Sequence, residues 1–135
     1  MGDVGELHRV PVPPSLLGES PMWHPKEGVL YWCDIAGHAL NRWNPTRREH
    51  DAWFFDNDVS CCSPLLDGGL LLALRDGLLR FDPATNARHR LVRAPYLAHE
   101  QRFNDGKADP QGRFWVGTVH EKREPQGALY RYVHS

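Results

Sequence analysis

The sequence has little cysteine, and its three cysteines are poorly spaced for a disulfide framework. Cys61 and Cys62 are adjacent, and adjacent cysteines form a bridge only with strain, which leaves Cys33 without an obvious partner. No pair follows the CxxC spacing of a structural zinc site. We therefore expect three reduced thiols in a cytosolic protein.

Long apolar runs and an excess of charge of either sign are also missing. The longest apolar stretch, residues 70–74, is too short to cross a bilayer, and residues 1–9 are acidic and polar, unlike a signal peptide. The chain has 16 Lys and Arg residues against 17 Asp and Glu residues, a formal net charge of −1. This balance predicts neither a nucleic acid nor a membrane as a partner.

Several familiar catalytic motifs are absent as well. There is no GxSxG nucleophile turn and no P-loop, so the sequence supports neither a serine hydrolase nor a nucleotide hydrolase. The 8 histidines are scattered, and none has the HxH or HxxxH spacing of a zinc site. We interpret them as solvated or singly packed residues.

What the sequence does contain is frequent turns and a repeat. Its 12 Gly and 11 Pro residues punctuate many short elements, which is typical of an all-β protein. Three units recur with a period of about 40 residues. Each begins with glycine and an apolar strand, turns, and ends in a strand with an Arg next to an aromatic residue: residues 28–45, 69–83 and 112–132.

Further strands are predicted between these units, over residues 49–55, 59–66 and 87–93. Together they give about four strands per period, the content of one β-propeller blade. We therefore predict about three four-stranded blades. A series of hairpins in a sandwich or an open barrel is the alternative, and the recurring glycine and Arg-aromatic pattern favours the propeller.

Two motifs, in order along the chain, carry a resemblance to a known family. They are residues 17–23 (LGESPMW) with 30–35 (LYWCDI), and residues 102–118 (RFNDGKADPQGRFWVGT) with 127–130 (GALY). From about residue 9 onward the chain resembles the senescence marker protein-30 (SMP-30)/gluconolactonase/LRE-like family, whose regucalcin-like members are metal-dependent sugar-lactone hydrolases. The resemblance implies a six-bladed β-propeller about twice this length, with residues 1–135 as its N-terminal half.

The resemblance also implies a divalent metal ion in the central channel, bound by a Glu, an Asn and an Asp. Only the Glu falls in this chain, at Glu19, and the other two ligands would lie beyond Ser135. A carboxylate suits a hard cation such as Ca²⁺, Mg²⁺ or Mn²⁺, and Zn²⁺ is a further candidate. Without the resemblance, Glu19 would be interpreted as a solvated residue of a surface turn.

Arg102 and Asn104 match the family's substrate-binding positions. Alternate residues of a strand point to one face, so these two side chains are expected to project together while Phe103 packs the other way. Their donors suit the oxygens of a sugar lactone. The residues that follow are expected to be structural: residues 105–107 end this strand, and residues 109–112 form a β-turn.

Glu121 is a further candidate for binding the substrate. By ungapped counting, however, Lys122 occupies the family's acidic position, which leaves the identity of the substrate open. In the implied mechanism the metal polarises the lactone carbonyl, and an aspartate expected beyond Ser135 activates the attacking water. No catalytic base is therefore assigned within this chain.

Three blades would leave apolar faces that a closed ring covers. A homodimer of two three-bladed halves would close such a ring, and a truncated, inactive product is another possibility. The segment around residues 7–12 is expected to be a strand that joins the last blade of a closed ring, and it would lack a partner in a lone half. A non-catalytic half-propeller that binds a partner is the rival hypothesis, and metal binding near Glu19 distinguishes the two.

Overall fold

The computed structural model describes residues 5–133. These residues form eleven β-strands and no helix, which confirms the prediction of an all-β fold. It follows that this part of the chain contains no helix long and apolar enough to cross a membrane.

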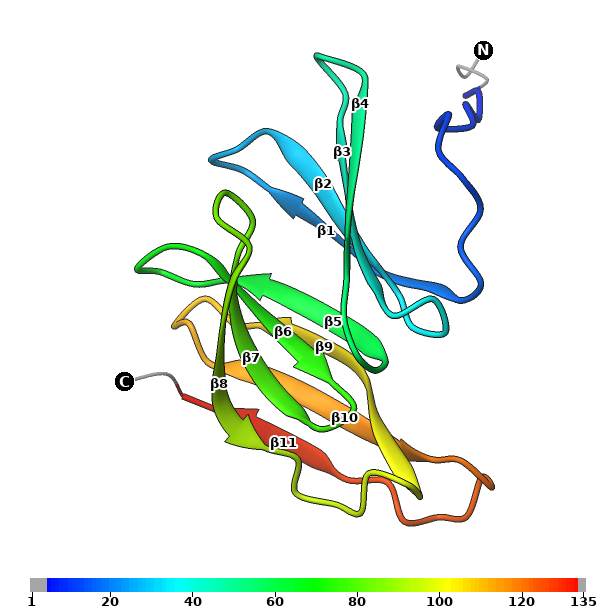
Figure 1. Ribbon diagram of the computed structural model, residues 1–135, viewed down its shortest axis with the longest axis vertical. Helices are drawn as coiled ribbons and strands as arrows, with labels where there is room; N and C mark the ends of the chain where they lie inside the picture. The colour runs from blue at the N-terminus through cyan, green and yellow to red at the C-terminus, as the bar shows by residue number, and fades with distance from the viewer. Residues whose placement is uncertain (1–4, 134–135) are drawn as a thin grey trace.

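The strands form three antiparallel sheets, and in each one strands that are consecutive in the chain pair with each other (Figure 1). The first sheet contains β1 (Gly18–His24), β2 (Val29–Asp34), β3 (Ala39–Asn44) and β4 (Glu49–Phe54); the second contains β5 (Val59–Pro64), β6 (Leu70–Leu74), β7 (Gly77–Asp82) and β8 (Ala87–Arg93); the third contains β9 (Gln101–Ala108), β10 (Phe114–His120) and β11 (Leu129–Tyr132). The three sequence repeats correspond to β2–β3, β6–β7 and β10–β11.

The second sheet lies between the other two, so both of its faces are covered (Figure 1). All five residues of β6 are buried. Leu70, Leu72 and Leu74 belong to the core shared with the first sheet, whereas Leu71 and Ala73 belong to the core shared with the third. A strand that is covered on both faces needs no polar alternation, which explains the uninterrupted apolar run.

Two expectations differ from the observed fold. The third sheet has three strands where four were predicted, because only Val133 of the described chain follows β11, too little for a turn and another strand. The segment over residues 7–12 forms no strand, and Leu7 and Val10 are exposed. It pairs with none of the described strands, and a strand forms only where a neighbour pairs with its backbone.

The tight turn predicted at residues 76–77 joins β6 to β7, and its glycine is required. Gly77 has a φ of 153°, and a Cβ at this position would lie 2.3 Å from the backbone oxygen of Val92 on β8. The obstacle is strand backbone, which cannot rotate aside as a flexible side chain can.

Gly77→Ala is therefore expected to lower the free energy of unfolding by about 2–4 kcal/mol. Gly28→Ala is the matched control, since Gly28 has a φ of 65° but nothing lies within 4 Å of an added Cβ. It should cost only about 1–2 kcal/mol. Urea unfolding followed by tryptophan fluorescence measures both values. Equal costs would contradict a steric role for Gly77.

Candidate functional site

A cavity of about 570 Å³ opens where the first strands of the three sheets meet. β5 packs beside both β1 and β9, which brings these three strands together. The cavity is lined by residues 19–23 of β1, residues 62–64 of β5 and residues 105–108 of β9. Sequence segments more than 80 positions apart thus share one concave surface.

Glu19 lies on the cavity because β1 is irregular at this point. The β1–β2 register shifts between Glu19 and Met22, and Ser20 has a φ of 58°, unusual for a residue with a side chain. Glu19 is exposed, and the neighbouring Ser20 hydroxyl donates a hydrogen bond of 3.3 Å to Oδ1 of Asp105 on β9. The irregular strand therefore places the Ser20 hydroxyl beside the Asp105 carboxylate, and Glu19 and Asp105 line the same cavity.

Asp105 was not anticipated as a site residue, because residues 105–107 are predicted to end the strand. The strand does end in this region, since β9 extends to Ala108, but Asp105 also lines the cavity. Phe103 pairs with Thr118 and Gly106 with Val116, so the residues between them form a bulge. The bulge interrupts the pairing of β9 with β10 only locally, and regular pairing continues on both sides of it.

Gly106 allows this continuation, because a Cβ at this position would lie 2.8 Å from the backbone oxygen of Trp115 and 2.9 Å from Sγ of Cys61. In an isolated sequence, Asn-Asp-Gly indicates a turn. The sequence around these residues does not distinguish a turn from a bulge, because the bulge depends on pairing of β9 with β10.

Arg102 and Asn104 project on the same side of β9, as predicted. Phe103 between them is 2% exposed, and Nη1 of Arg102 donates to Oδ1 of Asn104 at 3.2 Å. The same nitrogen also donates to the backbone oxygen of Phe103 at 3.0 Å. Both residues precede the part of β9 that lines the cavity, so they lie next to the lining rather than in it.

Glu121 directly follows β10 and is bound by an arginine. Its Oε1 accepts a hydrogen bond from Nη2 of Arg75. This bond and the positive charges of Arg75 and Arg102 hold the pKa of the Glu121 carboxyl below its ordinary value. Lys122 next to it is exposed, and its backbone N–H donates to Nδ1 of His120 at 3.1 Å.

The predicted β-turn at residues 109–112 is present. Gly112 N–H donates to the backbone oxygen of Asp109 at 3.0 Å, and Asp109 Oδ1 accepts from the N–H groups of Gln111 and Arg113. These bonds give the turn a structural role.

The three cysteines are free, as predicted; all three are buried, and Cys62 lines the cavity. Hydrogen bonding to Cys62, followed by burial, raises the pKa of the Cys33 thiol, and burial raises that of Cys61. The thiols of Cys33 and Cys61 are therefore protonated at neutral pH, which makes them poor metal ligands and poor nucleophiles.

The donor atoms at the cavity are of the chemical type that a hard divalent cation prefers. The carboxylates of Glu19 and Asp105 and the hydroxyl of Ser20 are oxygen donors, which Ca²⁺, Mg²⁺ and Mn²⁺ prefer. Within residues 5–133, however, no three His, Cys, Asp or Glu side chains gather in a metal-binding arrangement. The described chain thus offers part of a coordination shell.

Comparison with known proteins identifies the family that the sequence resembles. The sequence matches the family model described as SMP-30/Gluconolactonase/LRE-like region over residues 17–135. It is 39% identical over 114 residues to 6-deoxy-6-sulfogluconolactonase of Pseudomonas putida, covering 84% of this chain and 39% of that protein. It is 32% identical over 120 residues to regucalcin of Xenopus laevis, covering 84% and 40%. The chain thus spans about two fifths of the length of these relatives.

The fold of the chain is also similar to that of a solved structure from this family. The crystal structure of regucalcin from Agrobacterium tumefaciens str. C58, described as a calcium-binding protein, matches with a TM-score of 0.82 and 28% sequence identity, over 88% of this chain and 41% of that one. The three sheets are therefore blades of a β-propeller of the SMP-30 type, as the sequence predicts. By both its sequence and its fold, the chain belongs to the SMP-30/gluconolactonase/LRE-like family.

Proposed function

We propose that this chain supplies part of the active site of a metal-dependent hydrolase of sugar lactones, as the N-terminal part of a propeller. The observation that carries the proposal is that Glu19 and Asp105 line one cavity, while Arg102 and Asn104 lie on β9 just before the part of that strand that lines it. The Pseudomonas putida relative is named 6-deoxy-6-sulfogluconolactonase, which supports a lactone as the substrate class. In lactone hydrolysis, water adds to the ring carbonyl carbon, the ring C–O bond breaks, and a hydroxy acid forms.

Glu19, together with Asp105 of the same cavity, is proposed to bind the cation. A divalent cation, when bound, polarises a carbonyl oxygen and stabilises the negative charge that develops on it. Among Ca²⁺, Mg²⁺, Mn²⁺ and Zn²⁺, the oxygen donors favour the first three. The calcium-binding description of the Agrobacterium regucalcin supports Ca²⁺ in particular.

Arg102, Asn104 and Glu121 are proposed to bind the sugar. The guanidinium of Arg102 and the amide nitrogen of Asn104 can donate to hydroxyl and carbonyl oxygens of the substrate. Glu121 binds Arg75 through Oε1, and its Oε2 can accept a sugar hydroxyl. No residue of this chain is assigned as the general base that activates water.

Free thiols support a reducing compartment, and we propose the cytosol. Cys33, Cys61 and Cys62 are all unbridged and buried. Disulfides form and persist mainly in oxidising compartments, so a chain with three free thiols suits a reducing one.

Glu19→Gln is expected to lower lactone hydrolysis by about 100-fold or more, because the neutral amide is a poor ligand for a hard cation. The measurement is the rate of D-glucono-1,5-lactone opening with millimolar Ca²⁺ or Mn²⁺. Glu49→Gln, at an exposed position that begins β4, is the matched control and should retain the wild-type rate. Thermal unfolding without metal should be similar for all three proteins, since Glu19 is exposed. A Glu19→Gln protein with full, metal-stimulated activity would contradict the assignment.

A non-catalytic half-propeller is the second candidate, and one observation favours it. The described chain brings only two carboxylates to the cavity, fewer than a complete site for a hard cation needs. Calorimetric titration with Ca²⁺ distinguishes the two hypotheses. If the chain is part of a hydrolase, it should bind Ca²⁺, and Glu19→Gln should abolish this binding. If the chain is a scaffold, Glu19→Gln should have no effect on Ca²⁺ binding.

A second copy of the chain is the proposed partner that completes the ring. The core that the third sheet shares with the second involves Phe114, Val116 and Tyr130, whereas Trp115 and Leu129 are 36% and 69% exposed. Exposed apolar side chains on one sheet face are typical of a surface that another blade covers. Two-fold symmetry would bring the Glu19 and Asn104 of both copies toward one channel.

Light scattering is expected to give a mass of twice 15.4 kDa, with dimerisation strengthened by millimolar Ca²⁺ or Mn²⁺. Leu129→Lys should shift the equilibrium to monomer, because it places a charge in the proposed contact. Val92→Lys, at an exposed residue of β8 in the middle sheet, is the control that should leave the mass unchanged. A monomer that is indifferent to metal would contradict ring closure by a second copy.

A further inference from the structure

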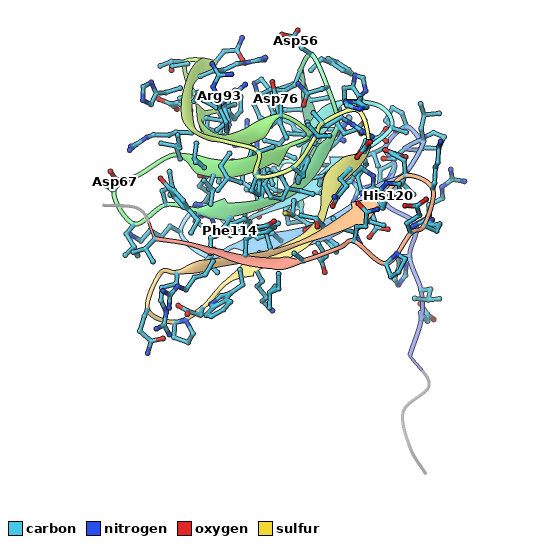
Figure 2. The ribbon with its side chains drawn as sticks, turned by 90° about the horizontal axis from the view of Figure 1, so that it is seen from below. Asp56, Asp67, Asp76, Arg93, Phe114 and His120 are labelled. Atoms are coloured by element: carbon cyan, nitrogen blue, oxygen red, sulfur yellow. The ribbon has the colours of Figure 1, made fainter. Side chains whose placement is uncertain are left out.

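Arg75 makes four polar contacts from a turn that the proposed mechanism does not use. It lies between β6 and β7 of the second blade, close to Asp76, which Figure 2 labels. Its Nε donates to Oδ2 of Asp58 at 2.9 Å, and its Nη1 donates to the backbone oxygens of Ala98 at 2.7 Å and Gln101 at 3.2 Å. Nη2 donates to Oε1 of Glu121.

These acceptors lie on both sides of the interface between the second and third blades. Asp58 precedes β5, and its other carboxylate oxygen lies 3.2 Å from Nε2 of His38 of the first blade. Ala98 precedes β9, and Gln101 is the first residue of that strand. Glu121 follows His120, the last residue of β10 (Figure 2). One guanidinium therefore connects the start of β9 with the end of β10.

The segment before β9 has further bonds to the same turn. The Tyr96 hydroxyl donates to the backbone oxygen of Arg75 at 2.7 Å, and Ala94 N–H donates to the backbone oxygen of Asp76 at 3.0 Å. Glu121 N–H donates to the backbone oxygen of Glu100 at 2.8 Å. Because Arg75 binds the carbonyl of Gln101, it acts on the residue directly before Arg102.

We propose that Arg75 is the positioning residue for the three sugar-binding side chains. It anchors the strand that carries Arg102 and Asn104, and it orients Glu121 so that Oε2 is presented to the substrate. This inference rests on the proposed function for the identity of the substrate, whereas the anchoring itself rests on the four contacts of the guanidinium.

Arginine suits this task better than lysine does. The acceptors lie in several directions around the planar guanidinium, whose five N–H groups point outward in a fixed fork. A lysine ammonium preserves the charge but places all of its donors on one atom. The Arg75→Lys substitution therefore tests geometry while it retains the positive charge.

The test compares wild type, Arg75→Lys, Arg75→Met and a matched control, Arg80→Lys. Arg80 lies on β7 of the same blade and donates to Oδ2 of Asp67 at 2.9 Å and to the backbone oxygen of Gly68 at 3.1 Å, outside the β9–β10 contacts. The readouts are KM and kcat for D-glucono-1,5-lactone, amide hydrogen exchange at Gln101 and Glu121, and the unfolding temperature.

Arg75→Lys is expected to raise KM about tenfold or more and to change kcat less than about threefold, because displaced binding groups weaken ground state and transition state alike. Amide exchange at residues 101 and 121 should accelerate, with a larger effect in Arg75→Met, and Arg80→Lys should match wild type. A purely structural role would lower the unfolding temperature and leave KM unchanged.

If wild type and Arg75→Lys have the same KM and the same exchange rates, the inference is overturned. If wild type hydrolyses no lactone, the proposed function fails separately, and the exchange rates still decide whether Arg75 anchors these segments. Unchanged exchange in both Arg75 variants would then overturn the inference as well.

Discussion

The leucine run of β6 is buried between two other sheets, and the arrangement of the blades depends on this contact. Burying a leucine side chain contributes about 1.5–3 kcal/mol. Leu70, Leu71 and Leu72 are each at most 2% exposed, and they point alternately toward the first and third blades. Because the middle blade must cover both faces, its inner strand β5 lies between β1 and β9. The cavity with Glu19 and Asp105 is a consequence of this packing.

The polar contacts that cross the blades have a different role. A chain of three ion pairs connects all three blades, from His38 through Asp58 and Arg75 to Glu121. The side chains of these residues are partly exposed. Exposed ion pairs contribute only about 0–1 kcal/mol each, less than one buried leucine. These contacts therefore contribute little to holding the blades together and chiefly determine how the ends of the strands are oriented.

Irregular backbone determines where the carboxylates lie. Ser20 has a positive φ beside Glu19, and a bulge at residues 104–105 interrupts the pairing of β9 with β10. Such backbone costs about 1–3 kcal/mol per strained residue and persists only where the surroundings stabilise it. Here the stabilisation comes from the regular pairing on either side, including Gly106 against Val116.

The sequence alone determined the all-β class, the repeat, most strand positions and the family, because turn residues and apolar runs are local signals. It also indicated that Arg102 and Asn104 share a strand face, since alternation along a strand is local. The approach of Asp105 to Ser20, 85 positions away, and the four contacts of Arg75 were decided only by the tertiary structure. Each depends on segments that come together only when the blades pack, and no spacing within one segment encodes that distance.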